Sequence, residues 1–110
     1  MAEDLQPLAG PYEIFEMTDG ETRTFQVASW KLGTIGIQTA EAPAGKLVKT
    51  LRIYVPQIHK PLGVNWWDVT SQTLIAQLLP YLELPGFETK KFTVTKYGVK
   101  PKARFTVQAA

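Results

Sequence analysis

The sequence has 110 residues, 45% of them hydrophobic and 20% charged, with a formal net charge of +2, which is ordinary for one soluble globular domain. It contains no cysteine, which excludes a disulfide framework and a thiolate metal site. No apolar run approaches the length of a membrane-spanning helix, and the acidic start at Met1–Asp4 is unlike a signal peptide. We therefore expect an intracellular protein, in the cytoplasm or, for a phage structural component, in the virion.

Residues 1–11 contain Pro7, Gly10 and Pro11 and show no hydrophobic periodicity. This composition predicts a flexible arm, followed by a single β-rich domain over residues 12–110.

Two alternating segments, Tyr12–Met17 and Thr22–Val27, flank the pair Asp19-Gly20. Asp-Gly between alternating strands is a strong signal for a type I′ turn, which needs positive φ at both central positions. The sequence therefore predicts a first β-hairpin. The facing pairs in that register are Glu16 with Arg23, Ile14 with Phe25, and Tyr12 with Val27.

The next predicted strands are Thr34–Gln38 and Lys46–Val55, separated by a small-residue loop at 39–45. Alternation in the longer strand places Leu47, Leu51, Ile53 and Val55 on one face and Val48, Thr50, Arg52 and Tyr54 on the other. Because Lys49 falls on the otherwise apolar face, we expect a bulge or an exposed strand end there.

A single helix is predicted after Trp66 and Trp67. Adjacent residues of an extended chain point to opposite sides, so one of these rings should be buried and the other more exposed. The apolar stripe of the helix consists of Leu74, Ile75, Leu78, Leu79 and Leu82. The candidate caps are Asp68, Thr70 and Ser71. Pro80 should end or kink the helix at about Leu79.

The last 22 residues, Thr89–Ala110, carry six Lys or Arg and no acidic residue. Alternation predicts a hairpin of Lys91–Tyr97 and Lys102–Val107. One predicted face holds Phe92, Val94, Ala103, Phe105 and Val107. The other holds Lys91, Thr93, Thr95, Tyr97, Lys102, Arg104 and Thr106. A cationic face with an aromatic ring favours a polyanion, whereas exposed lysines also protect sheet edges from aggregation, and both interpretations stay open.

The order of a hairpin, one or two further strands, one helix and a final hairpin predicts a mainly β (α+β) fold. An OB-like antiparallel barrel or sheet of five or six strands, with one helix before the C-terminal hairpin, has this order. A helix packed on another antiparallel meander fits almost as well.

Enzyme chemistry, a cofactor and a metal are not expected. His59 is the only histidine, so a histidine-based triad or a multi-histidine metal site cannot be built within the chain, and we expect His59 to be plain surface. The acids around the first turn are Glu13, Glu16, Asp19 and Glu21. We expect them to solvate that turn, because a catalytic pair needs a sheltered cleft.

Binding of single-stranded nucleic acid, with DNA favoured over RNA, is the sharper hypothesis. Such binding needs cations for phosphates and exposed rings on which bases stack. The predicted binding residues are Arg52, Tyr54, Trp66, Lys91, Lys96, Tyr97, Lys100, Lys102 and Arg104, with Trp67 as the alternative to Trp66. In an OB barrel the third strand and the last hairpin turn contribute to the binding face.

One block of the sequence consists of two segments, Asp68-Val-Thr-Ser-Gln-Thr-Leu-Ile-Ala-Gln-Leu-Leu79 and Lys91-Phe-Thr-Val-Thr-Lys-Tyr-Gly-Val-Lys-Pro-Lys-Ala-Arg-Phe-Thr-Val107. This block resembles the C-terminal part of small single-stranded-DNA-binding proteins of phages and mobile elements. The resemblance implies an OB-type fold and sequence-independent DNA binding. Many single-strand binders end in an acidic tail, whereas this chain ends Val107-Gln108-Ala109-Ala110.

A non-enzymatic structural, assembly or adaptor protein, such as a phage component or the subunit of a complex, fits the same surface. Acids gather in residues 1–30 and bases in residues 31–60 and 89–110. An acidic and a basic pole would suit head-to-tail homo-oligomers. No membrane partner is expected.

Overall fold

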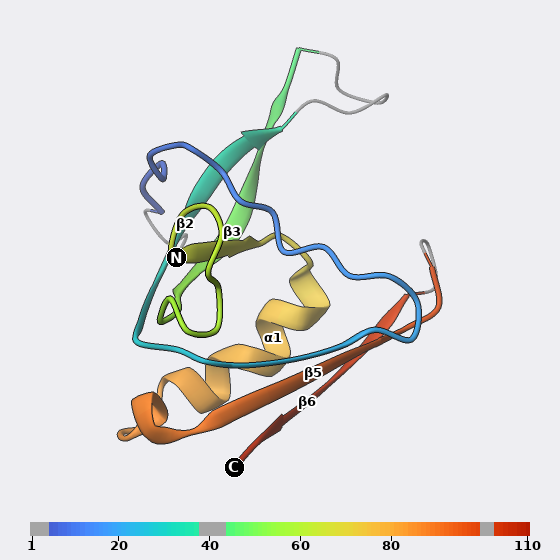
Figure 1. The fold of residues 1–110 in the computed structure, drawn as a ribbon. Helices are drawn as coiled ribbons and strands as arrows, with labels where there is room; N and C mark the ends of the chain where they lie inside the picture. Colours follow the sequence, from blue (N-terminus) through green and yellow to red (C-terminus); the bar gives the residue numbers. More distant parts are fainter. Residues whose placement is uncertain (1–4, 38–43, 100–102) are drawn as a thin grey trace.

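The structure, a computed structural model, describes residues 5–37, 44–99 and 103–110 (Figure 1). Its elements are β1 Thr22–Gln26, β2 Ser29–Ile37, β3 Lys46–Tyr54, β4 Trp66–Val69, α1 Gln72–Leu82, the short 3-10 helix η1 Phe87–Thr89, β5 Lys91–Tyr97 and β6 Arg104–Ala109. They form two three-stranded antiparallel sheets, β2-β3-β4 and β1-β5-β6. The predicted mainly β class, with one α-helix before a C-terminal hairpin, is confirmed. Over the described residues the two sheets stay separate and do not close into a barrel.

None of the helices in the described ranges is long and apolar enough to cross a membrane.

The first hairpin prediction was wrong. A turn is present at Asp19-Gly20, but it is not of type I′, because only glycines of the described residues have positive φ and Asp19 therefore does not. Gly20 has φ +83° and Glu21 N donates to Thr18 O at 3.0 Å. However, β1 pairs with β5, not with residues 12–17. Phe15 and Met17, only 7% and 6% exposed, enter the core, whereas the predicted register placed Tyr12 and Ile14 on the same face as Phe25 and Val27. A shift of one residue reverses the two faces of an extended segment, and the core takes the fully apolar pair Phe15 and Met17 while the Tyr12 hydroxyl stays outside it.

Residues 6–17 form a strap across the sheet β2-β3-β4 instead. At the β2 edge, Leu8 N donates to Thr34 O at 2.8 Å and Thr34 N donates to Gln6 O at 3.0 Å. At the β4 edge, Phe15 N donates to Asp68 O at 2.9 Å. Leu8 is 3% exposed, so residues 6–8 of the predicted arm are docked on β2. Both edges of this sheet are therefore partly covered by the same segment, which protects them from pairing with other chains.

Gly33 explains how the strap approaches β2 so closely. A Cβ atom at this position would lie 2.6 Å from Gln6 O and 2.6 Å from Leu8 Cγ. No other residue type fits there without displacing the strap.

The strand β3 keeps a continuous register with β2, and Thr34 faces Lys49. The described register therefore contains no bulge at Lys49. The start of β3 is exposed, with Leu47 72% exposed. This agrees with the alternative prediction of an exposed strand end.

The helix α1 begins after Ser71, whose side chain accepts a hydrogen bond from Leu74 N at 3.4 Å. Pro80 does not end the helix at Leu79, because α1 continues to Leu82. Leu82 is 2% exposed in the core, and Glu83 N donates to Leu79 O at 2.9 Å, so the last turn closes beyond the proline. The free energy gained by burying the Leu82 side chain outweighs the cost of the helix hydrogen bond that Pro80, which has no N–H, cannot make.

Candidate nucleic-acid interface

The outward face of the sheet β1-β5-β6 is lined by hydroxyl and amide side chains. Thr22 lies opposite Thr95 and Thr24 opposite Thr93, with Oγ1 atoms 2.9 and 3.4 Å apart. The ten side chains of this threonine face are Thr22, Thr24, Gln26, Lys91, Thr93, Thr95, Tyr97, Arg104, Thr106 and Gln108. Phe92 and Val94, on the other side of β5, are fully buried, so the predicted alternation of the C-terminal hairpin is confirmed.

The threonine face carries positive charge only. Lys91 and Arg104 are exposed, and none of the ten residues is acidic. Tyr97 is 52% exposed and lies directly opposite Arg104. The structure thus brings three predicted binding residues, Lys91, Tyr97 and Arg104, onto one sheet face.

Lys96 belongs to the other face of β5 and was wrongly grouped with these cations. It lies opposite Phe105, and its Nζ donates to Met17 O at 2.8 Å. Its ammonium therefore stabilises the packing of the strap against β5.

Arg52 is also wrongly predicted as a phosphate contact, because it is buried. Its Nε donates to Asp68 Oδ1 at 2.6 Å and its Nη2 to Asp68 Oδ2 at 3.2 Å, and the two side chains are 4% and 0% exposed. Desolvation acts to lower the pKa of Arg52, but the hydrogen bond and charge of Asp68 outweigh it and raise that pKa above its ordinary value. A guanidinium held in this way is not available to a phosphate.

Tyr54 and Trp66 lie beside Arg52 in the other sheet. Their ring centroids are 5.8 Å apart, and the Arg52 guanidinium lies 4.7 Å from the Trp66 ring centroid, so this face of the indole is already covered. The buried Trp66 N–H has no hydrogen-bond partner among the described residues. This group does not share a sheet with the threonine face.

The prediction that one of the two tryptophans is buried is wrong, since both are half-buried. They do contact different groups. The Trp67 ring lies 5.2 Å from Phe15 and 5.4 Å from Phe25 in the core.

Lys100 and Lys102, the remaining predicted contacts, lie outside the described residues. The predicted loop at 39–45 also falls largely outside them.

Two acids of the first turn have structural roles. Glu21 accepts from Thr18 N at 2.9 Å and from Arg23 Nη2 at 2.7 Å. These contacts, the Thr18 N–H first, hold the pKa of Glu21 below its usual value. Asp19 Oδ1 accepts from Gly98 N at 2.7 Å, which joins this turn to the end of β5.

His59 is not plain surface, because its Nδ1 accepts a hydrogen bond from Gln26 N at 3.0 Å. The β3–β4 loop thereby covers the edge of β1. Sequence patterns gave no signal for this contact, nor for the contribution of Thr22, Thr24 and Gln26 to the threonine face, since both depend on long-range pairing.

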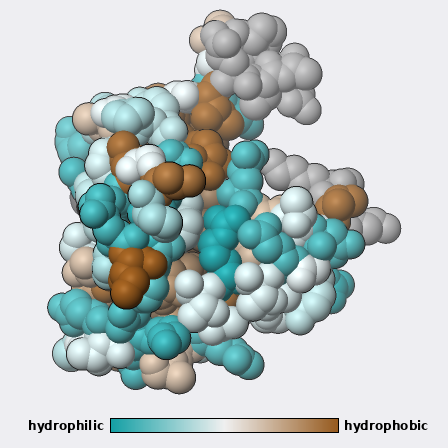
Figure 2. Space-filling view, viewed as in Figure 1, coloured by the Kyte–Doolittle hydropathy of each residue, from teal (hydrophilic) through white to brown (hydrophobic). Residues whose placement is uncertain are grey.

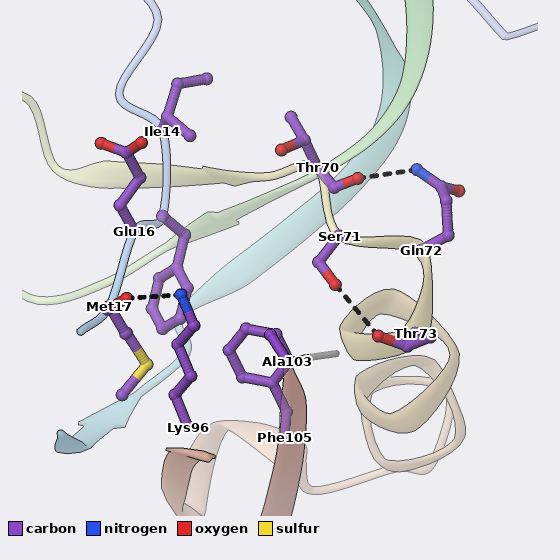
Figure 3. Close-up of a pocket in the computed structure, with 11 residues that line it drawn as sticks. Ile14, Glu16, Met17, Thr70, Ser71, Gln72, Thr73, Lys96, Ala103 and Phe105 are labelled. Atoms are coloured by element: carbon purple, nitrogen blue, oxygen red, sulfur yellow. Dashed lines mark hydrogen bonds between the residues drawn. The ribbon is translucent and has the colours of Figure 1, made fainter. Parts of the chain in front are cut away.

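A pocket of about 380 Å³ lies behind the hairpin end, on the side of β5 away from the threonine face. Figure 3 shows Ile14 and Glu16 on one side of it, Thr70 and Thr73 on the other, and Phe105 between them. Ser71 Oγ and Thr73 Oγ1 lie 3.1 Å apart, and the lining includes the charged side chains of Glu16 and Lys96 as well as apolar Met17 and Phe105. Its lining offers neither a nucleophile paired with a base nor a set of metal ligands.

In the described ranges no group of three or more His, Cys, Asp or Glu side chains could hold a metal ion. Comparison with known proteins found no match to a protein-family model, to a curated protein or to a solved structure.

Proposed function

We propose that this protein binds single-stranded nucleic acid, DNA foremost, through the threonine face and without marked sequence preference. The observation that carries the proposal is an acid-free sheet face on which exposed Arg104 lies opposite the exposed Tyr97 ring and exposed Lys91 lies at the other end of β5. Arg104 and Lys91 can neutralise phosphates, which supplies the salt-dependent part of the affinity. Tyr97 offers a stacking surface that accepts any base.

The hydroxyl and amide groups of this face support binding to the backbone of the strand. Thr, Gln and Arg side chains hydrogen-bond phosphate and sugar oxygens without reading sequence. The element order, with four strands before the helix and a hairpin after it, is compatible with an OB-like arrangement with an added strand, which we include in the same proposal.

The test is a titration of fluorescently labelled oligo-dT with the protein, followed by anisotropy because the threonine face contains no tryptophan. The charge-reversed variant Lys91→Glu/Arg104→Glu should lose binding at low salt. The matched control Lys31→Glu/Lys46→Glu reverses two exposed lysines of the other sheet and should keep most of the affinity. Circular dichroism should show that both variants are folded.

Equal losses in the two double variants would mean that net charge alone drives binding and would remove the threonine face from the mechanism. Parallel titrations with duplex DNA and single-stranded RNA establish the polymer class. Absence of binding to all three polymers would favour the assembly or adaptor role, which is supported by the exposed aliphatic residues of the β3–β4 loop.

A further inference from the structure

The end of the β5–β6 hairpin carries the Tyr97 ring, which has few contacts of its own. Tyr97 is the last residue of β5, and it is 52% exposed. In the part of the chain that the structure describes, neither a hydrogen bond nor another ring holds this side chain. Figures 1 and 2 show this end of the hairpin at the right-hand limit of the molecule, apart from α1. The position of the ring therefore depends on the backbone that carries it.

The turn at residues 18–21 holds the backbone on the N-terminal side of Tyr97. Gly20 N donates to Lys96 O at 2.8 Å, and Lys96 N donates to Glu21 O at 3.0 Å. Figure 1 shows this turn beside the end of β5. Both contacts join backbone atoms, so neither depends on a particular side chain.

Asp19 holds the backbone on the other side of Tyr97, and it does so with its side chain. The Oδ1 atom of Asp19 accepts a hydrogen bond from Gly98 N at 2.7 Å. Gly98 has φ +82°, a conformation in which the chain leaves the strand. Because a hydrogen bond to a carboxylate is stronger than one between neutral groups, Asp19 fixes the point at which the chain leaves β5.

We infer that Asp19 is a positioning residue of the threonine face, because its hydrogen bond to Gly98 N holds the Tyr97 ring where a base can stack on it. The ring then stays beside Arg104, which lies directly across from it. A ring on a fixed backbone loses less conformational freedom when a base binds, which favours binding. This role rests on the proposed function, since it concerns how that site keeps its stacking ring in place.

The test compares two substitutions that remove the same charge. Asp19→Asn keeps an oxygen acceptor for the Gly98 amide, whereas Asp19→Ala removes it. Asp19 has a negative φ, so alanine fits this turn position without strain. The asparagine variant is measured on freshly purified protein, because Asn-Gly sequences deamidate. Hydrogen exchange of the Gly98 amide should accelerate in the alanine variant and stay slow in the asparagine variant.

Anisotropy titrations with labelled oligo-dT measure the effect on binding. Asp19→Ala should bind about 2- to 10-fold more weakly than Asp19→Asn, the range expected for one lost hydrogen bond. The slope of log affinity against log salt should be the same in both variants, because no phosphate contact changes.

A double-mutant cycle shows whether Asp19 acts through the ring. Asp19→Ala should have little further effect in a Tyr97→Ala background, since the ring that Asp19 positions is already absent. A general loss of stability would weaken binding by the same factor in both backgrounds.

Equal affinity of the two Asp19 variants would overturn the positioning role and leave the proposed function standing. So would equal hydrogen exchange of their Gly98 amides, or an undiminished effect of Asp19→Ala in the Tyr97→Ala background. Failure of the wild type to bind any of the three polymers would overturn the proposed function, and the role of Asp19 in binding with it.

Discussion

Arg52 and Asp68 show how a residue's partner decides its role. Alternation along β3 correctly places Arg52 on the face opposite Leu51 and Ile53, but alternation cannot show that Asp68 of β4 lies directly across from it. Asp68 Oδ2 also accepts from Glu13 N at 2.9 Å. One carboxylate thus neutralises a buried guanidinium and anchors the strap.

Replacing Asp68 with alanine should lower the free energy of unfolding by about 3–5 kcal/mol, because it leaves a buried arginine without a counter-charge. The matched control is Glu21→Ala, which breaks a partly exposed ion pair with Arg23 and should cost about 0–1 kcal/mol. Urea denaturation followed by circular dichroism measures both. Similar costs for the two variants would mean that the Arg52–Asp68 pair is solvated in solution.

Glu21 gives a prediction for acid stability. Its pKa in the folded protein lies below the ordinary value of 4.5 because the Thr18 N–H and Arg23 favour the carboxylate. The stabilisation it gives is therefore fully present above the unfolded-state value and is lost as the pH falls through the folded value. Between about pH 5 and pH 3, the wild type should lose more stability than Glu21→Gln. Parallel urea titrations across that range measure this, and identical slopes would contradict it.

At the scale of elements, sequence patterns predicted the features that depend only on residues close together in the sequence. The Ser71 cap, the course of β3 and the two faces of β5 and β6 follow from residues close in sequence, so they could be read without the fold. The pairing of β1 was missed because the Asp19-Gly20 turn is compatible with more than one partner strand. The choice of β5 is made by Phe15, Phe25 and Phe92, which meet only in the core.

The strap provides a test at this scale through two glycines of β2. Gly33→Ala should loosen residues 6–8 from β2, because the new Cβ would lie 2.6 Å from both Gln6 O and Leu8 Cγ. Gly36→Ala meets nothing within 4 Å and should be neutral or slightly stabilising, since alanine lowers the entropy of the unfolded chain. Hydrogen exchange of the Leu8 and Thr34 amides should accelerate only in the first variant. Equal protection in both would mean that the strap is not docked as described.

At the scale of the whole molecule, the fold separates charges that the sequence groups together. Arg23, Arg52, Lys60 and Lys96 each bind a carboxylate or a backbone carbonyl of the same chain. Lys91 and Arg104 remain exposed on a sheet face without acids. The candidate binding site is therefore smaller than predicted and lies on the outer side of β5 and β6. It also includes the threonines of β1, whose place beside β5 no charge pattern could have indicated.

If the protein binds a strand as proposed, this contraction assigns the stacking role to Tyr97 and not to Tyr54 or Trp66. Tyr97→Ala should weaken binding to oligo-dT by about 1–3 kcal/mol, the contribution of one base stacked on a ring. The slope of log affinity against log salt should stay unchanged, because it counts phosphate contacts at about 0.7 for each contact on a single strand. Tyr12→Ala, which removes a ring of similar exposure from the strap, should leave both quantities unaltered. Titrations at two salt concentrations separate the two quantities. A changed slope in the Tyr97 variant would mean that the ring positions the neighbouring Arg104 and does not stack on a base.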